Sequence, residues 1–225
     1  MTRHALVSGS SSGIGAAVAA ALLADGWRVT GFDRAAPTIA APAFTPVAVA
    51  LDDAAATEAA LAALDPVDAI VHAAGVMRVG RLGELDAESG ALMWRLHVDA
   101  AIRLCDALAP AMPDGGRIVL VGSRAAQGVA GRSQYAATKA ALVGLARSWA
   151  KELAPRKITV NVVAPAATDT PMLHDPDRAG AAPVLPPIGR FVRPAEVAAL
   201  TRFLLSDDAG AITGQQILVC GGASL

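Results

Sequence analysis

The segment HALVSGSSSGIG, residues 4–15, carries the strongest indication of how this chain folds. Its first half is a short apolar run that is typical of a buried strand. Its second half is a glycine-rich turn that opens an alanine- and leucine-rich helix. Glycine lets the backbone turn sharply and lie close to a ligand. The free N–H groups and the dipole at the start of a helix favour a phosphate at that point.

The glycines of this segment follow the spacing GxxxGxG rather than the commoner GxGxxG. A glycine turn after a strand can also be a tight turn that binds nothing. Its place at the first strand–turn–helix junction favours the binding of a dinucleotide. The candidate residues of the turn are Gly9, Ser12, Gly13, Ile14 and Gly15.

The rest of the chain repeats the alternation of apolar strands and helices. We expect strands at residues 4–9, 27–33, 44–51, 67–75, 116–123, 158–165 and 215–220. We expect helices at residues 15–26, 53–64, 86–111, 133–153 and 194–206. Continuous apolar strands that alternate with helices indicate an α/β fold with a parallel sheet covered on both faces. The prediction is a single Rossmann-type, doubly wound domain over residues 1–225 with a seven-stranded parallel sheet. The proline-rich segment 34–43 is too broken for a helix, so one helix is expected to be missing from one face.

Composition excludes several classes of protein. The formal net charge is −1, and no basic block occurs, so neither nucleic acid nor an acidic membrane is an expected partner. Apolar residues make up 54% of the chain, but no apolar run approaches the roughly 18 residues that a spanning helix needs. No signal peptide is recognisable at the N-terminus. Cys105 and Cys220 lie far apart without metal-binding spacing, which predicts two reduced, buried thiols in a cytoplasmic protein and no metal site.

Asp33 ends the second predicted strand, 18 residues after Gly15. In a dinucleotide-binding fold an acidic side chain at this place bonds the ribose hydroxyls of the adenosine and repels a 2′-phosphate. The sequence therefore favours NAD over NADP. Arg34 is adjacent, and an arginine there could meet the phosphate of NADP instead. The alternative for Asp33 is a turn residue at the end of a strand.

The chain has a single tyrosine, Tyr135, which lies four residues before Lys139 on a predicted helix. Residues four apart share one face of a helix, so the two side chains point together. A phenol has a pKa of about 10, and a neighbouring cation lowers it toward working pH. Ser123 ends the fifth strand, at the sheet edge where ligands of this fold bind. A hydride carrier, a tuned phenol and a hydroxyl are what the interconversion of an alcohol and a carbonyl needs. Alone, a tyrosine and a lysine four apart are usually an amphipathic edge.

With these motifs in order, the chain resembles the short-chain dehydrogenase/reductases, in their small single-domain branch and close to the 3-oxoacyl-carrier-protein reductase type. The motifs that carry the resemblance are SGSSSGIG (8–15), Asp33, LDD (51–53), HAAG (72–75), Ser123 with YAATK (135–139), NVVAPAATDTPM (161–172), RPAEVA (193–198) and ITGQQILVCGG (212–222). The resemblance covers nearly the whole chain.

The resemblance implies further roles. Asp52 and Asp53 would hold the adenine, and Lys139 would also bond the nicotinamide ribose. The cofactor cleft would be lined by Ala73, Ala74 and Gly75, and the nicotinamide end by Pro165, Thr168 and Thr170. Residues 170–190 would form a substrate lid, with His174, Asp175 and Asp177 as its polar points. Family members usually pair their long helices, which implies a homodimer or a homotetramer.

The chain departs from the family pattern at a few positions. His97 stands where the family usually carries an asparagine that kinks its helix and relays protons through water to the lysine. An imidazole can relay protons, so His97 is either a substitute relay or a plain packed histidine. His72 replaces the first asparagine of the usual NNAG, where the backbone matters more. Ala166 replaces a glycine, and Ser8 replaces a threonine and keeps the hydroxyl.

The sequence therefore predicts an NAD-dependent oxidoreductase that interconverts a secondary alcohol and a ketone. Tyr135 would move the proton of the substrate oxygen, Lys139 would tune Tyr135, and Ser123 would position that oxygen. An NADPH-dependent carbonyl reductase that uses Arg34 is the first alternative. A dinucleotide-binding regulator with impaired catalysis is the second. The substrate would be a small alcohol or ketone whose identity the residues do not fix.

Overall fold

The computed structural model describes residues 2–175 and 182–225 of the chain. Seven parallel strands form one sheet in the order β3-β2-β1-β4-β5-β6-β7, which confirms the predicted doubly wound α/β fold. The strands are β1 (His4–Ser8), β2 (Arg28–Asp33), β3 (Phe44–Ala48), β4 (Ala69–His72), β5 (Arg117–Val121), β6 (Thr159–Pro165) and β7 (Gln216–Val219). The order reverses between β1 and β4, and a crevice outside the carboxyl ends of the strands at such a reversal is where ligands of this fold bind.

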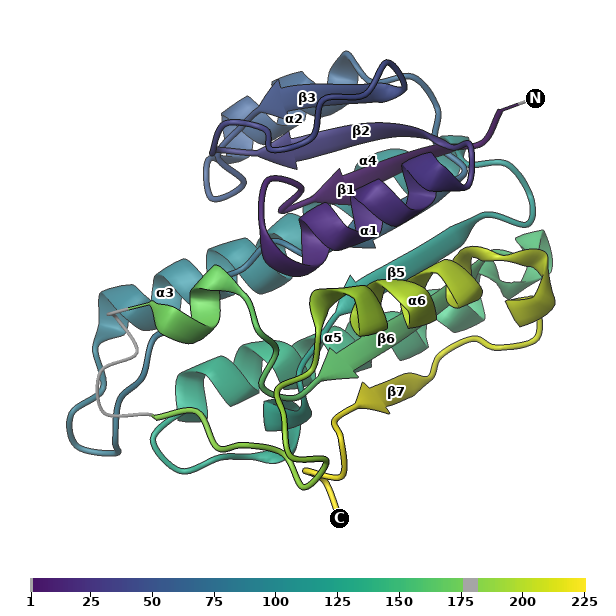
Figure 1. The fold of residues 1–225 in the computed structure, drawn as a ribbon. Helices are drawn as coiled ribbons and strands as arrows, with labels where there is room; N and C mark the ends of the chain where they lie inside the picture. The colour runs from purple at the N-terminus through teal and green to yellow at the C-terminus, as the bar shows by residue number, and fades with distance from the viewer. Residues whose placement is uncertain (1, 176–181) are drawn as a thin grey trace.

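Helices cover both faces of the sheet (Figure 1). On one face lie α1 (Gly13–Ala24) and α6 (Pro194–Leu205), and on the other lie α2 (Ala54–Ala62), α4 (Ala100–Leu108) and α5 (Ser133–Leu153). Successive side chains of β1 enter different cores, because a strand points alternate residues to opposite faces. Leu6 joins the α4–α5 core, whereas Ala5 and Val7 join the α1–α6 core. Both faces are therefore apolar, as the continuous apolar runs of the strands indicate.

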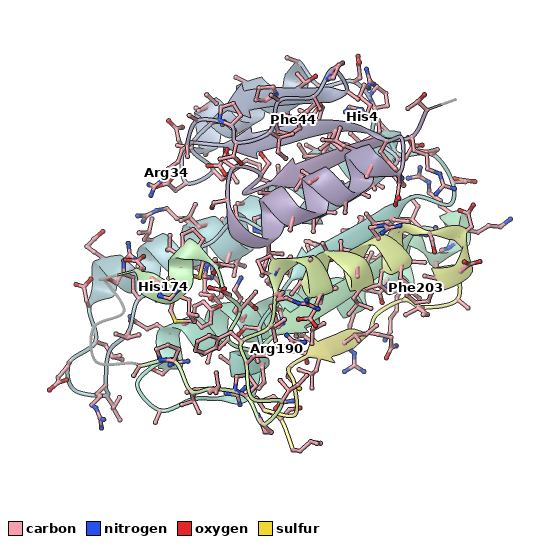
Figure 2. All side chains as sticks on the ribbon, in the orientation of Figure 1. His4, Arg34, Phe44, His174, Arg190 and Phe203 are labelled. Carbon is pink, nitrogen blue, oxygen red and sulfur yellow. The ribbon has the colours of Figure 1, made fainter. Side chains whose placement is uncertain are left out.

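No helix lies between β2 and β3, as the proline-rich segment predicts. The ring of Phe44 covers this part of the sheet instead (Figure 2). A methyl group built on Gly31 of β2 would meet the Phe44 ring at 2.6 Å, so the glycine makes room for the aromatic ring. Strand β3 is an edge strand, and it carries Pro46 in its middle. Proline cannot donate to a strand ladder, so an edge is where the sheet tolerates it.

The long helix predicted for residues 86–111 is present as an uninterrupted helical run over residues 87–111, but its hydrogen-bond pattern changes along its length. It consists of α3 (Ala87–Trp94), a π-helical turn η1 (Arg95–Asp99), α4 and the short 3-10 turn η2 (Ala109–Ala111). The ring Nε2 of His72 lies 3.1 Å from the carbonyl oxygen of Leu96 inside the π-helical turn. A side chain that bonds a helix carbonyl from outside is a recognised cause of such an irregularity. None of the helices in the described part of the chain is both long and apolar enough to cross a lipid bilayer.

Candidate active site

The glycine turn after β1 forms a cradle that larger residues would fill. Gly9 and Gly13 have positive φ angles of 71° and 52°. A Cβ on Gly9 would lie 2.8 Å from the backbone of Ala74, and a Cβ on Gly15 would overlap the carbonyl oxygen of Gly9. Ser12, the N-cap of α1, makes no side-chain bond to the helix, so the N–H groups of the first turn remain available to an anion. The residues present therefore fit the diphosphate of a dinucleotide.

A cavity of about 290 Å³ opens in front of this turn. Its lining brings together most of the residues predicted to hold the cofactor, namely Gly9, Ser12, Gly13, Ile14, Gly15, Asp33, Asp52, Ala73, Ala74, Gly75 and Thr170. Asp53 is not among the lining residues. Its carboxylate accepts a hydrogen bond from Ala56 N–H at 3.0 Å and caps helix α2. Pro165 and Thr168 line a second cavity described below.

The carboxylate of Asp33 is fixed by the backbone around the cavity. It accepts hydrogen bonds from Ser11 N–H and Ala35 N–H, both at 2.9 Å. This arrangement holds the negative charge at the end of β2, where the ribose of a bound dinucleotide would lie. Arg34 lines the same cavity but is exposed at the margin of the molecule, beyond the end of β2 (Figure 2).

Ser8 and His72 brace the loop that follows β4. The His72 Nε2 faces the carbonyl of Leu96 and therefore carries the hydrogen, so Nδ1 accepts a bond from the Ser8 hydroxyl at 2.8 Å. The same hydroxyl oxygen accepts bonds from Ala73 N–H at 3.1 Å and Ala74 N–H at 3.2 Å. Burial, and next the positive charge of Lys139, lower the pKa of His72 to about 3, so its ring is neutral. The side chain of His72 thus has a structural role that the sequence did not indicate.

The second cavity, of about 430 Å³, holds the two predicted catalytic hydroxyl groups. Ser123 follows the end of β5, and Tyr135 lies in the first turn of α5. Both side chains line the cavity together with Pro165, Ala166, Thr168 and Thr170. The Ser123 hydroxyl oxygen accepts a bond from Ala125 N–H at 3.1 Å, which fixes its position. Thr170 and Met172 line both cavities, so the two hollows adjoin one another.

Lys139 lies one helical turn after Tyr135 and is buried. Its Nζ donates to the carbonyl of Val121 at 3.0 Å and lies 5.8 Å from the centre of the Tyr135 ring. Burial lowers the pKa of Lys139 from 10.5 to about 7, so protonated and neutral forms coexist near neutral pH. The predicted pairing of tyrosine and lysine on one helix face is thus present in the structure.

His97 is fully buried and is bonded through both ring nitrogens. Val76 N–H donates to Nε2 at 3.1 Å, so the hydrogen of the ring is on Nδ1, which donates to the Thr138 hydroxyl at 2.8 Å. Thr138 donates in turn to the carbonyl of Tyr135 at 2.9 Å. The rings of His97 and Tyr135 also meet edge to face, with centres 5.6 Å apart. Burial, then the charge of Lys139, hold the pKa of His97 well below its ordinary value.

His97 and Lys139 both reach toward Gly75 in the loop after β4. A methyl group on Gly75 would lie 2.6 Å from His97 Nε2 and 3.7 Å from Lys139 Nζ. His97 therefore connects this loop with the first turns of α5, close to the lysine. Its role as a proton relay stays a prediction.

Several residues of the site were not found from the sequence. Thr138 lies between the tyrosine and the lysine, and its place on the buried face of α5 was a usable signal. Arg124 and Arg132 line the cavity of the hydroxyl groups, and both lie within the interval from Ser123 to Tyr135. The carbonyl of Val121 is a backbone group, and no residue pattern marks it.

The polar residues of the predicted lid are only partly described. His174 is exposed and lies 3.5 Å from a carboxylate oxygen of Asp169, and Asp175 pairs with Arg78 at 3.5 Å. Asp177 lies outside the described residues. Within residues 2–175 and 182–225, no group of His, Cys, Asp and Glu side chains is arranged to hold a metal ion. Cys105 is buried as expected, whereas Cys220 is only partly buried; both are free thiols.

Comparison with known sequences gives one consistent family. A family model described as enoyl-(acyl carrier protein) reductase matches residues 9–224. The chain is 36% identical to the 2,3-dihydro-2,3-dihydroxybenzoate dehydrogenase of Escherichia coli, over 99% of this chain and 97% of that protein. It is also 36% identical to the 3-oxoacyl-[acyl-carrier-protein] reductase FabG of Salmonella typhimurium, over 97% of this chain and 96% of that protein.

Solved structures agree with the sequence relatives. A short chain dehydrogenase family protein from Francisella tularensis superposes with a TM-score of 0.90 at 27% identity, over 100% of this chain and 99% of that chain. A blue fluorescent protein from a metagenomic library, solved in complex with NADPH, superposes with a TM-score of 0.86 at 31% identity, over 99% and 98% of the two chains.

Proposed function

We propose a specific reaction for this chain, which belongs to the short-chain dehydrogenase/reductase family of oxidoreductases: it interconverts a secondary alcohol and a ketone. A nicotinamide dinucleotide supplies or accepts the hydride when bound. The residues of the chain bind the dinucleotide, position the substrate oxygen and move its proton.

The observation that carries this proposal is the shared wall of the two cavities. Ser123 and Tyr135 line one cavity, the glycine turn lines the other, and Thr170 and Met172 line both. A substrate beside the two hydroxyl groups would therefore lie next to the nicotinamide end of a dinucleotide that extends from the glycine turn. Proximity of this kind is a large part of the catalysis of hydride transfer.

Ser123 and Tyr135 would have different roles at the substrate oxygen. The Ser123 hydroxyl would hold that oxygen by a hydrogen bond. In the oxidation direction Tyr135 accepts the proton of the alcohol as the hydride leaves the carbon, and in the reduction direction it returns the proton. The protonated form of Lys139 favours the phenolate, because an opposite charge nearby stabilises the ionised group. A lysine pKa of about 7 lets small changes around the buried amine alter how much of this charge is present.

NAD is the dinucleotide that Asp33 favours. Its carboxylate is fixed by two backbone N–H groups at the place of the adenosine ribose, where a 2′-phosphate would be repelled. NADPH is the second candidate. Arg34 lines the same cavity, and the relatives include 3-oxoacyl-carrier-protein reductases and a structure in complex with NADPH.

Turnover of a substrate panel tests the proposed reaction. NADH and NADPH formation would be followed over secondary alcohols, and their oxidation over ketones, for the unchanged protein and Tyr135→Phe. We expect the variant to bind the dinucleotide as before and to lose turnover by about 10²- to 10⁴-fold, the usual contribution of a proton-transfer group. Equal turnover in both proteins would rule out the assigned role of Tyr135. Tight dinucleotide binding without turnover of any substrate would favour the impaired-regulator alternative.

Assembly into a homodimer or homotetramer stays a prediction. The outer side of α4 and α5 is hollowed by about 250 Å³, and its lining includes Ile102, Cys105 and Trp149. Ile102 is 40% exposed, and it would be covered if this face packs against a second chain. Light scattering after size exclusion measures the subunit count directly.

A further inference from the structure

We propose that the substrate of this enzyme carries a carboxylate, and that Arg124 is the residue that selects it. This inference rests on the proposed function and names the substrate class of the same site. Arg124 directly follows Ser123 and opens the short 3-10 turn η3 (Arg124–Gln127). Its side chain is partly buried and lines the cavity that contains Ser123 and Tyr135.

The charges around this cavity are unbalanced. Arg124 and Arg132 are both among its lining residues, whereas no Asp or Glu is, in the part of the lining that the structure describes. Asp175 lies two residues after the lining residue Leu173 but does not line the cavity itself, and its carboxylate is paired with Arg78. Two positive charges in this lining favour an anion in the cavity, because a partly desolvated cation gains most from an opposite charge.

Arg124 is the better placed of the two arginines to meet a ligand. Arg132 already has an interaction partner within the protein. The side chain of Arg124 makes no hydrogen bond or ion pair with any other described residue. Its place next to Ser123, which would hold the reacting oxygen, puts the charged group of the substrate within a few carbon atoms of the carbonyl. A 2-oxo acid, a 3-oxo acid or an oxo acid with more carbon atoms between the two groups has this arrangement. The corresponding hydroxy acids have it too.

A carboxylate fits this arginine better than a phosphate ester does. One planar guanidinium pairs with the two oxygens of a carboxylate in a bidentate manner. A phosphate monoester carries nearly two negative charges, of which one arginine would neutralise only one. Much of the remaining wall is apolar, with Met77, Val129, Leu173 and Val184, so the rest of the substrate is expected to be a short hydrocarbon body.

Matched pairs of substrates test the assignment. We would measure kcat/KM for reduction of 3-oxobutanoate, 4-oxopentanoate and 5-oxohexanoate, each beside its neutral methyl ester, with saturating NADH or NADPH. The proteins would be the unchanged enzyme, Arg124→Gln, Arg124→Lys and the control Arg147→Gln. Arg147 is an exposed residue of α5, 12 residues and therefore about 18 Å along the helix from Tyr135.

We expect the unchanged enzyme to prefer at least one acid over its ester by about 100-fold or more, the size of discrimination that a charged contact provides. Arg124→Gln is expected to remove most of this acid-to-ester ratio. Arg124→Lys is expected to remove part of it, because lysine keeps the positive charge but not the planar guanidinium that pairs with both carboxylate oxygens. Arg147→Gln is expected to leave the ratio and the rate unchanged. A merely structural role of Arg124 would lower both rates together and leave the ratio intact, which would overturn the proposal.

Turnover of the esters as fast as the acids, still dependent on Tyr135, would overturn the carboxylate proposal and leave the proposed function standing. If none of the six compounds is turned over, the wider panel of alcohols and ketones decides the proposed reaction, and binding decides this inference separately. The dinucleotide complex of Tyr135→Phe would then be melted with and without 4-oxopentanoate, because a ligand of the folded state raises the melting temperature. A rise that Arg124→Gln abolishes supports the carboxylate site. No rise with any of the three acids overturns it.

Discussion

His72 donates the hydrogen of its Nε2 to the carbonyl oxygen of Leu96 at 3.1 Å, and so joins the end of β4 to the π-helical turn that presents His97. Two departures from the family pattern, His72 and His97, are therefore parts of one arrangement. The hydroxyl of Ser8 donates to the other ring nitrogen of His72, Nδ1, and so joins the end of β1 to the same arrangement.

Replacement of His72 by leucine is expected to lower both stability and turnover. It leaves the partly buried carbonyl of Leu96 and the buried hydroxyl of Ser8 without this partner, which costs about 1–3 kcal/mol in the free energy of unfolding. The π-helical turn then loses its support, and kcat is expected to fall. Urea unfolding and steady-state kinetics measure the two effects. The control is His174→Leu, since His174 is exposed. Equal stability of the two variants would argue against the bracing role of His72.

Acid is expected to destabilise the protein through the same histidine. The pKa of His72 is about 3 in the folded chain and about 6.5 when unfolded, so between these values the unfolded chain binds the extra proton. The free energy of unfolding therefore falls as pH is lowered from 6.5 toward 3. His97 acts in the same direction. We expect His72→Leu to show a shallower fall between pH 6.5 and 4 in urea titrations; an unchanged slope would contradict a neutral buried His72.

His97 is expected to act by position rather than by titration. Both of its nitrogens are bonded to protein groups, so a glutamine, which can accept from Val76 and donate to Thr138, should keep kcat within about tenfold. Leucine can do neither, so the leucine variant should lose more of kcat than the glutamine variant does. The pH profiles of kcat for the three proteins provide the check. A glutamine variant as impaired as leucine, with a shifted profile, would instead identify His97 as a proton relay.

Two glycine-to-alanine changes are expected to have opposite effects. Gly75→Ala places a methyl group 2.6 Å from His97 Nε2 and should destabilise the fold and weaken dinucleotide binding. Gly144→Ala lies in α5, where a methyl group meets nothing within 4 Å, and should stabilise the helix by about 0.5–1 kcal/mol. Thermal unfolding and NADH titration compare them. Tolerance of Gly75→Ala in both measurements would show that His97 and the loop can move apart.

Asp33→Ala is expected to shift cofactor preference toward NADP. Removing the fixed charge relieves repulsion of the 2′-phosphate and removes an acceptor for the ribose hydroxyls, so the NADP-to-NAD ratio of kcat/KM should rise by about ten- to a hundredfold. Arg34→Ala should lower the same ratio if the arginine meets the phosphate. An unchanged ratio in Asp33→Ala would discard the NAD assignment.

The strands and the glycine turn could be predicted because their cause is local. Apolar runs and the glycine spacing of residues 8–15 hold their information within a few positions. The π-helical turn at residues 95–99 could not be predicted from the local sequence, because its partner, His72, is 24 positions from Leu96. The LDD motif predicts Asp53 as a cofactor-binding residue. An aspartate before an alanine-rich helix serves equally well as the N-cap of that helix. Arg124 could not be predicted as a site residue, because a single charged residue forms no sequence motif. Only the fold shows which residues surround it.

Pro46, in the outermost strand of the sheet, also bears on how the molecule behaves when crowded or heated. An edge strand offers unpaired backbone groups to any extended segment of another molecule, and this is how many sheet proteins begin to aggregate. Pro46 removes a donor from the centre of the five-residue edge strand β3. A second chain that tried to extend the sheet there would find its ladder interrupted after at most two residues. Pro46 thus protects this side of the sheet from uncontrolled growth into fibres.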